Sequence, residues 1–308
     1  MLNRIILTLI IATFFSCKSE KPVSVSLEED VAILANDSLT GRETGTPQEI
    51  MAADYLQKRM EQIGLEPKGN AGTYFQTFTF KPKTDPHKEV QYTITGDSTI
   101  TGTNVIGYID NQAENTIIIG AHYDHLGMGG EGSLYRGEEP QIHNGADDNA
   151  SGVAILLQVA DSLSSKYKGN NYLIISFSGE EMGLLGSNYF VKNATIDLSK
   201  VNYMLNMDMV GRLREDNTLS VSGTGTAPVW AQYLNVLNED FKLVLKESGI
   251  GPSDHTSFYL QDIPVLHFFT GQHEDYHKPS DDADKLNYEG MRKITGYIVD
   301  LVGELDDD

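Results

Sequence analysis

The chain has little cysteine and little positive charge. Its 308 residues include one cysteine, Cys17, so the rest of the chain cannot form a disulfide, a thiolate nucleophile or a cysteine-ligated metal site. Lysine and arginine number 23 against 44 aspartates and glutamates, a formal net charge of −21. Such an acidic protein repels phosphate backbones, so we expect no nucleic-acid partner. A metal site would have to use histidine and carboxylate ligands.

The remaining composition is that of a globular protein. Hydrophobic residues make up 40% and charged residues 22% of the chain, which excludes collagen-like, coiled-coil and largely disordered proteins. The length suits one large α/β domain or two small ones, with enough apolar side chains for a core.

The first residues resemble an export signal. Arg4 precedes an uncharged apolar stretch, Ile5 to Phe15, that is too short to span a bilayer as a helix. Because Cys17 follows almost at once, the segment resembles a bacterial lipoprotein signal, in which this cysteine becomes lipidated. An ordinary secretory signal and an uncleaved anchor are the alternatives.

These features divide the chain into a lipoprotein signal peptide (1–17), a tether (18–26) and one globular domain (27–308), whose function the motifs described below indicate. We expect an exported protein that is anchored to a membrane by the lipid on Cys17. It would lie on the periplasmic side or at the outer membrane of a bacterial cell.

Apolar periodicity predicts strands that alternate with helices. The expected helices cover 27–34, 49–63, 151–163, 183–191, 229–237 and 288–305. The expected strands cover 74–80, 104–109, 116–121, 172–177, 201–209 and 264–269. This alternation predicts an α/β fold: a single domain with a mostly parallel mixed sheet and helices on both faces.

Histidine and carboxylate residues gather where the predicted strands end. The segments are HYDHLG (122–127), NGADDNASG (144–152), SGEE (178–181), NMDM (206–209) and DYHKPS (275–280). The carboxyl ends of neighbouring parallel strands face one crevice, so these segments should meet. Bound cations would relieve the repulsion between so many carboxylates. Without thiolates, histidine plus carboxylate is the expected ligand set for zinc.

Each segment also has an ordinary explanation when taken alone. His122 with Asp124 could be a surface pair, Glu180-Glu181 a solvated helix start, and Asp147-Asp148 a turn with a helix cap. Their joint occurrence at strand ends favours a metal site.

In this order the segments HYDHLG, NGADDNASG, SGEEMGLLGS, NMDMVG and DYHKPSDD resemble the co-catalytic di-zinc aminopeptidases of peptidase family M-twenty-eight. Relatives of that family include glutamate carboxypeptidases and glutaminyl cyclases. The resemblance runs from about Leu39 to Lys285 and implies the zinc-exopeptidase (phosphorylase/hydrolase-like) fold. The short connection between Phe80 and Asn104 implies that the protease-associated insert domain of some relatives is absent.

The resemblance implies two Zn²⁺ ions per chain. Asp147 would bridge both ions, His122 and Asp208 would complete the site of one, and Glu181 and His277 the site of the other.

The resemblance also implies catalytic roles. Glu180 would be the general base, and Asp124 would orient the ring of His122. Tyr276 matches a tyrosine that in some relatives donates to the developing oxyanion. The Asp147-Asp148 peptide is typically cis in this family.

The chemistry is consistent with these roles. Two zinc ions that share a carboxylate hold a water between them as hydroxide. Glu180 can take the proton of this water and pass it to the leaving amine. It would point away from Glu181 if the pair leaves an extended strand end.

Other polar residues have less defined roles. Asp254 and His255 are candidate substrate contacts, with a turn cap as the alternative for Asp254. His125 and His143 are expected to support the site from behind or to face solvent. The segment from Gly41 to Gly45 resembles an N-terminal segment of the family that lies close to the cleft, and we expect it to form a turn before a helix. A Ser/His/Asp triad is disfavoured because no Gly-x-Ser-x-Gly elbow is present.

The predicted function is a zinc-dependent aminopeptidase that hydrolyses N-terminal residues from peptides with a free N-terminus. It would act through a metal-bridged hydroxide with Glu180 as base. A carboxypeptidase, an amidase or a glutaminyl cyclase on the same fold, or a non-catalytic binding lipoprotein, are the alternatives. The preferred side chain and the oligomeric state are left open.

Overall fold

The computed structural model describes residues 26–82, 90–92 and 98–306. The predicted signal peptide, Cys17 and the tether up to residue 25 lie outside the described residues, as does part of the connection between Phe80 and Asn104. Among the described residues, no helix is both long enough and apolar enough to cross a bilayer.

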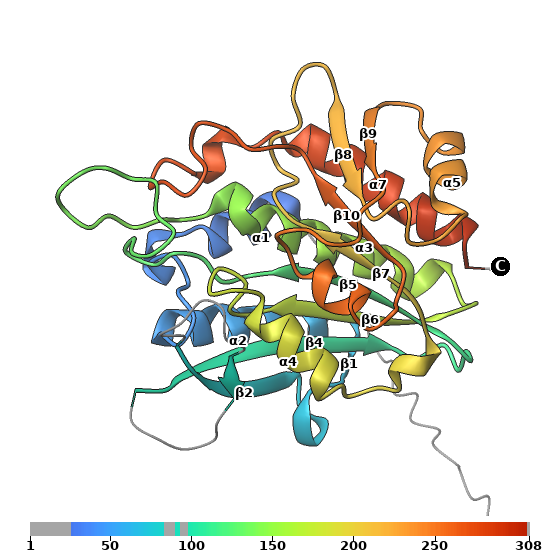
Figure 1. The fold of residues 1–308 in the computed structure, drawn as a ribbon, viewed down its shortest axis with the longest axis horizontal. Helices are drawn as coiled ribbons and strands as arrows, with labels where there is room; N and C mark the ends of the chain where they lie inside the picture. The colour runs from blue at the N-terminus through green and yellow to red at the C-terminus, as the bar shows by residue number, and fades with distance from the viewer. Residues whose placement is uncertain (1–25, 83–89, 93–97, 307–308) are drawn as a thin grey trace, which may run out of the picture.

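One mixed sheet runs through the described part of the chain, in the order β3-β2-β4-β6-β5-β7-β10-β8-β9 with β1 beside β4 (Figure 1). Its strands are β1 (Glu66–Pro67), β2 (Phe75–Lys81), β3 (Gln91–Tyr92), β4 (Ile100–Ile109), β5 (Thr116–His122), β6 (Asn171–Phe177), β7 (Val201–Met207), β8 (Thr218–Ser222), β9 (Lys242–Lys246) and β10 (Val265–Phe269).

The centre of this sheet is parallel. Strands β6, β5, β7 and β10 pair in parallel, whereas β4 pairs antiparallel with β2 and β6, and β8 pairs antiparallel with β10. The predicted α/β fold with a mixed sheet is therefore confirmed, but the sheet is not mostly parallel: among the described strands four pairs are parallel and five are antiparallel. Parallel pairing is concentrated in these four central strands and recurs between β8 and β9.

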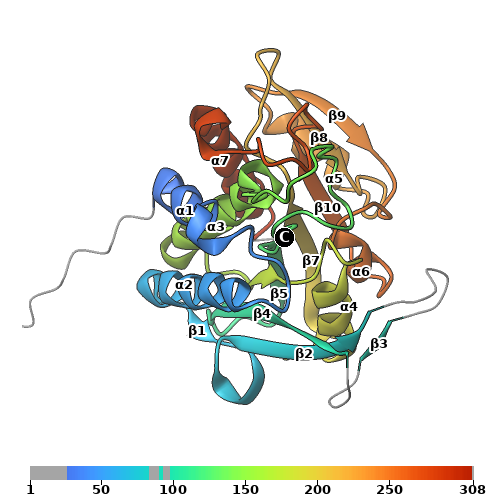
Figure 2. The ribbon, with the colours of Figure 1, turned by 90° about the vertical axis from the view of Figure 1, so that its left-hand side faces the viewer.

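Helices cover both faces of the sheet. They are α1 (Leu27–Leu34), α2 (Pro47–Ile63), α3 (Gly152–Lys166), α4 (Leu185–Lys192), α5 (Trp230–Val236), α6 (His255–Tyr259) and α7 (Tyr288–Glu304). Figure 2 shows α1, α2, α3 and α7 on one side of the sheet and α4 and α6 on the other.

Local sequence signals set the limits of the first two helices. Ser26 and Thr46 cap α1 and α2, and each side chain accepts a hydrogen bond from the backbone N–H three residues further on. Pro47 fits the first turn of α2, where its missing N–H costs nothing. Gly64, at φ 90°, ends α2 in the left-handed conformation that glycine adopts without strain.

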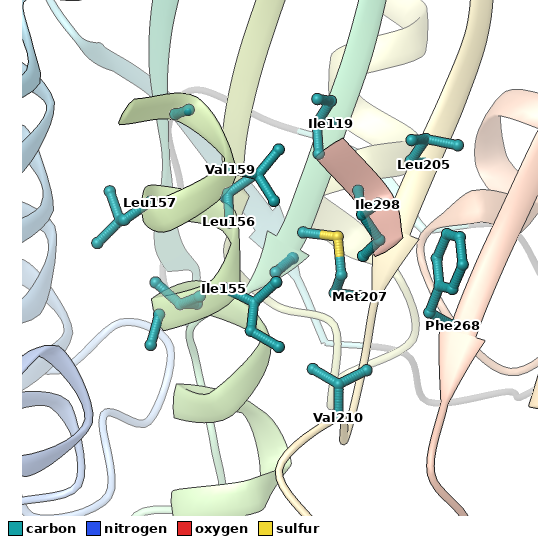
Figure 3. Close-up of a cluster of buried hydrophobic side chains, with 14 of the residues drawn as sticks. Ile119, Ile155, Leu156, Leu157, Val159, Leu205, Met207, Val210, Phe268 and Ile298 are labelled. Atoms are coloured by element: carbon teal, nitrogen blue, oxygen red, sulfur yellow. The ribbon is translucent and has the colours of Figure 1, made fainter. Parts of the chain in front are cut away.

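The core between α3 and the sheet fixes the strands that carry the polar segments. Figure 3 shows this contact, and every side chain that it labels is buried. The labelled residues are Ile119, Ile155, Leu156, Leu157, Val159, Leu205, Met207, Val210, Phe268 and Ile298. Burying one such side chain stabilises the fold by about 1.5–3 kcal/mol, so the strand ends project from a rigid base.

The predicted helices and strands are confirmed, and most boundaries shift by one to four residues. The sequence analysis missed the short elements β1, β3, β8, β9 and α6. In β9, burial alternates between exposed and half-buried residues, and among the strands of the described residues β8 alone pairs with it. A short edge strand of this kind carries a weak apolar signal.

Candidate metal centre

The polar segments meet at the carboxyl ends of the central strands, as predicted. His122 is the last residue of β5, and Asp208 follows β7 directly. Glu180 and Glu181 lie in the turn after β6, and a turn over residues 146–151 opens α3. His277 comes from the loop after β10.

Two groups of ligand atoms lie on either side of one carboxylate, that of Asp148. Its Oδ1 is 3.3 Å from Nε2 of His122, which is in turn 3.5 Å from Oδ1 of Asp208. Its Oδ2 is 3.1 Å from Nε2 of His277, which is 3.3 Å from Oε2 of Glu181. Asp148 therefore lies between the His122–Asp208 pair and the Glu181–His277 pair.

The sequence analysis gave this central position to Asp147, and that prediction is wrong. The Asp147 carboxylate accepts hydrogen bonds from the backbone N–H of Gly211 at 2.7 Å and from the hydroxyl of Ser151 at 3.0 Å. Its Oδ2 is 3.1 Å from Nε2 of His273. The carboxylate of Asp147 is thus occupied by hydrogen bonds from Gly211 and Ser151, whereas the side chain of Asp148 faces His122 and His277. The cis peptide likewise lies one residue further on, between Asp148 and Asn149.

The turn that carries Asp148 is held by a buried carboxylate from a distant segment. Oδ2 of Asp281 accepts hydrogen bonds from the backbone N–H groups of Asp147 at 2.9 Å and of Asp148 at 3.1 Å. The Asn149 side chain donates to the carbonyl oxygen of Met207 at 2.9 Å, which ties the turn to β7. These contacts select which of the two aspartates faces the site.

Asp124 organises the turn of the glutamates more than the ring of His122. Its carboxylate accepts hydrogen bonds from the backbone N–H groups of Glu180 at 3.1 Å and Glu181 at 3.4 Å. It also accepts one from the hydroxyl of Thr44 at 3.1 Å. The Nδ1 of His122 lies 3.2 Å from the carbonyl oxygen of Asp124 but 3.7 Å from its carboxylate. The ring is therefore oriented through the backbone.

Glu180 stands beside the first pair. Its carboxylate, Asp208 and His122 have ligand atoms within 4.8 Å of one another. The two glutamates diverge because they lie in a turn and not at an extended strand end, which corrects the sequence expectation. Burial raises the pKa of Glu180, and the nearby Asp208 and Glu181 raise it further against the opposing effect of His122.

His277 is held by the loop that precedes the 146–151 turn. Its Nδ1–H donates to the carbonyl oxygen of Gly132 at 2.8 Å, and its own carbonyl accepts from the N–H of Leu134 at 2.9 Å. Burial would lower the pKa of His277, but its hydrogen bond to Asp148 and the charge of Glu181 raise it to about 9. The loop thus leaves Nε2 turned toward the carboxylates.

Tyr276 packs directly on this histidine. The two rings are stacked with centroids 3.8 Å apart. Burial raises the pKa of the Tyr276 hydroxyl, and the carboxylates of Asp148, Glu181 and Asp208 add to this effect. The hydroxyl therefore stays protonated at neutral pH and close to the candidate metal centre.

Asp254 and His255 lie behind the site. Both side chains are fully buried at the start of α6, and the His255 ring stacks on His267 with centroids 4.5 Å apart. Burial raises the pKa of Asp254 to about 7. In this structure neither residue is exposed to a substrate, and their predicted substrate contacts stay predictions.

Arg42 is a supporting residue that the sequence analysis did not identify. The segment from Gly41 to Gly45 was expected to be only a turn, but Arg42 is fully buried. Its guanidinium donates to the carbonyl oxygens of Tyr123 at 2.7 Å, Asn144 at 2.6 Å and Gly145 at 3.0 Å, and to that of Leu34. Burial lowers its pKa to about 10, so it stays charged at neutral pH.

The donor set fits divalent cations. The side chains of His122, His277, Asp148, Asp208 and Glu181 offer two imidazole nitrogens and three carboxylates. Two groups of three residues have ligand atoms within 4.8 Å of one another: His122, Glu180 and Asp208, and His125, Asp148 and Glu181. Without a cation, so many buried carboxylates would repel one another. Imidazole with carboxylate is a ligand set that zinc accepts.

Comparison with known proteins finds a match to a peptidase family. The model of Peptidase family M28 matches residues 104–302. A probable leucine aminopeptidase of Trichophyton verrucosum (strain HKI 0517) is 28% identical over 222 residues, which cover 66% of this chain and 55% of the relative. The chain thus spans about half the length of the curated relatives that it matches.

Two solved structures show the same fold. A Zn-dependent exopeptidase from Parabacteroides distasonis superposes with a TM-score of 0.71 at 17% identity, covering 92% of this chain and 99% of the other. A glutaminyl cyclase from Bacteroides thetaiotaomicron gives a TM-score of 0.69 at 18% identity, covering 90% and 96%. At these identities the likeness extends to the fold alone.

Proposed function

Because this chain belongs to peptidase family M28, we propose that it is a zinc-dependent aminopeptidase that hydrolyses the N-terminal residue of peptides. The observation that carries the proposal is the position of Asp148. Its two carboxylate oxygens lie 3.3 Å and 3.1 Å from the Nε2 atoms of His122 and His277. A carboxylate between two imidazoles is suited to bridge a pair of cations.

Five residues would hold two zinc ions. His122 and Asp208 would bind one ion, Glu181 and His277 the other, and Asp148 both. Bound zinc would supply a Lewis acid and would lower the pKa of a coordinated water.

Glu180 is the general base of the proposed reaction. Its carboxylate lies within 4.8 Å of the ligand atoms of His122 and Asp208. In the proposed assignment Asp148 completes that ligand set, which leaves Glu180 available for proton transfer. Because its pKa is raised, it can accept the proton of the attacking water and hold it until the amine leaves. The hydrogen bond from the backbone N–H of Glu180 to the carboxylate of Asp124 holds Glu180 in position for this proton transfer.

Tyr276 would stabilise the oxyanion in the proposed reaction. Its hydroxyl is protonated at neutral pH and lies near the same carboxylates, so it can donate to an oxygen that gains negative charge.

The charge around the site favours a substrate with a free amine. The loop that holds His277 carries three exposed glutamates, Glu131, Glu138 and Glu139. A protonated N-terminal amine is attracted to such a region, whereas a blocked N-terminus is not.

Metal analysis and one hydrolysis assay test the proposal. The purified protein should contain about two zinc per chain and should cleave leucine amide but not N-acetyl-leucine amide. Glu180→Gln should keep the metal and lose about 100-fold or more in kcat. Glu239→Gln, on the distant groove between α5 and α7, is the matched control.

Three results would contradict the proposal: full activity in Glu180→Gln, a preference for blocked substrates, or a metal-free protein that is fully active. Conversion of an N-terminal glutaminyl peptide to its cyclic product without hydrolysis would instead favour the glutaminyl cyclase alternative.

A further inference from the structure

His125 is a buried histidine that belongs to neither proposed ligand set. It is 1% exposed, and its Nδ1 lies 2.6 Å from Oε1 of Glu181. The other oxygen of the same carboxylate, Oε2, faces Nε2 of His277 at 3.3 Å. The two oxygens of Glu181 are thus divided between a supporting histidine and the candidate metal centre.

The ring of His125 has little freedom to move. A side chain at Gly145 would place its Cβ 2.5 Å from Cδ2 of His125, so the ring packs against bare backbone. The backbone N–H of His125 donates to the carbonyl oxygen of Arg42 at 3.4 Å. The ring of His125 also packs edge to face against the ring of His277, with centroids 5.7 Å apart.

The direction of the hydrogen bond follows from the chemistry of Glu181. A glutamate that binds a cation is ionised, and an ionised carboxylate only accepts. Nδ1 of His125 must therefore carry the proton and donate it. Nε2 of His125 is buried without a hydrogen-bond partner, and the residue forms a group with Asp148 and Glu181 whose ligand atoms lie within 4.8 Å of one another. With Nδ1 donating to Glu181, His125 would act on a cation through this glutamate.

We propose that His125 is a positioning residue for one of the two cation sites, the site formed by Glu181, His277 and Asp148. It holds Glu181 with Oε2 toward that site and thereby sets how tightly the site binds zinc. This inference rests on the proposed function, because it presupposes a cation at the candidate metal centre.

The contacts of His125 make the effect one-sided. The hydrogen bond and the ring contact of His125 reach Glu181 and His277, which are both ligands of the same proposed ion, and its ligand atom also lies within 4.8 Å of those of Glu181 and the shared Asp148. The other ion would be held by His122 and Asp208, whose closest link to this group is the shared Asp148. Loss of the hydrogen bond from His125 to Glu181 should therefore lower the zinc affinity of the site that contains Glu181 and His277. The zinc affinity of the other site should stay unchanged.

Zinc binding distinguishes the two sites without an activity assay. Zinc-loaded full-length protein is equilibrated against chelator buffers of graded free zinc, and bound metal is counted. The wild type should release zinc with two high affinities. His125→Phe, which keeps a ring but removes the donor, should weaken one affinity by about 10–100-fold and keep the other.

A conservative variant separates the hydrogen bond from the volume of the ring. The amide of Asn can place a donor near the position of Nδ1. At the site formed by Glu181 and His277, His125→Asn should therefore bind zinc more tightly than His125→Leu. This pair also serves if His125→Phe does not fold. Tyr297→Phe is the matched control, because it also keeps a buried ring and removes a hydrogen-bond donor, the hydroxyl that bonds to the carbonyl oxygen of Leu234 away from the candidate metal centre; it should bind zinc like the wild type.

Several outcomes would overturn the inference. They are unchanged zinc affinities in His125→Phe, an equal loss at both sites, or an Asn variant that binds no better than the Leu variant. A wild type that binds no zinc would refute the proposed function itself, so the two failures are distinguishable.

Discussion

At the scale of single residues, two adjacent aspartates have opposite roles. Asp148 faces the histidines of the candidate metal centre, whereas Asp147 receives hydrogen bonds from Gly211 and Ser151. A sequence motif with two neighbouring aspartates does not reveal which one faces the ligands.

Asparagine substitutions separate these roles. Asp148→Asn should lose both zinc ions and activity, because an amide is a poor bridging ligand. Asp147→Asn should keep measurable zinc, with an affinity lower by about 10–100-fold at most, because it acts on the site through the turn. Zinc content and leucine amide hydrolysis of both variants check this expectation. If Asp147→Asn abolished binding and Asp148→Asn spared it, the structural assignment would be wrong.

At the scale of secondary-structure elements, the first turn of α2 is tied to the sheet by one buried carboxylate. Glu49 accepts hydrogen bonds from the backbone N–H groups of Gly45 at 2.5 Å and Thr103 at 3.0 Å. It also accepts bonds from the hydroxyls of Ser178 at 2.5 Å and Tyr123 at 3.2 Å. The helix is thereby linked to β4 and to the segments after β5 and β6.

The pKa of Glu49 makes this link pH-dependent. Burial raises the pKa to about 7 from 4.5, against hydrogen bonds that lower it. Between these values the folded protein keeps a proton that the unfolded chain has released. The free energy of unfolding should therefore fall as the pH rises from about 4.5 to 7, by about 3 kcal/mol at most from this residue.

Urea unfolding of the metal-free protein at several pH values tests this dependence. Glu49→Gln does not titrate, so its unfolding free energy should fall less steeply across that range than that of the wild type. Glu61→Gln, an exposed position on the same helix, should keep the wild-type slope. Parallel curves for wild type and Glu49→Gln would contradict the expectation.

The elements themselves were largely predictable from the sequence. Continuous apolar runs such as Tyr172 to Phe177 and the 3–4 spacing in α2 are local signals, and both elements are present. Strands β8 and β9 were missed because each is only five residues long, although β8 alternates between half-buried polar residues and buried Leu219 and Val221. Their place in the sheet depends on the pairing of β8 with β10 and of β9 with β8, which no local pattern encodes.

At the scale of the whole molecule, the candidate metal centre joins five segments that are far apart in the chain. The unfolded chain cannot hold His122, Asp148, Glu181, Asp208 and His277 together.

Zinc should therefore bind the folded state and stabilise it, by about 2.7 kcal/mol at a free zinc concentration of 100 times Kd. Thermal unfolding with and without zinc should show a rise in Tm of several degrees, whereas magnesium, which prefers oxygen ligands, should have little effect. A Tm that does not respond to zinc would contradict this linkage.

The sequence by itself determined the α/β class, the strands that carry polar residues at their ends and, through its motifs, four of the five residues around the candidate metal centre. These features follow from periodicity and from the order of motifs, which are local. Only the tertiary structure decided that Asp148 and not Asp147 faces His122, that Arg42 is buried beneath the loops, and that His125 holds Glu181. The physical reason is that side-chain directions in an irregular turn are set by distant partners, such as the Asp281 carboxylate on the backbone of the 146–151 turn.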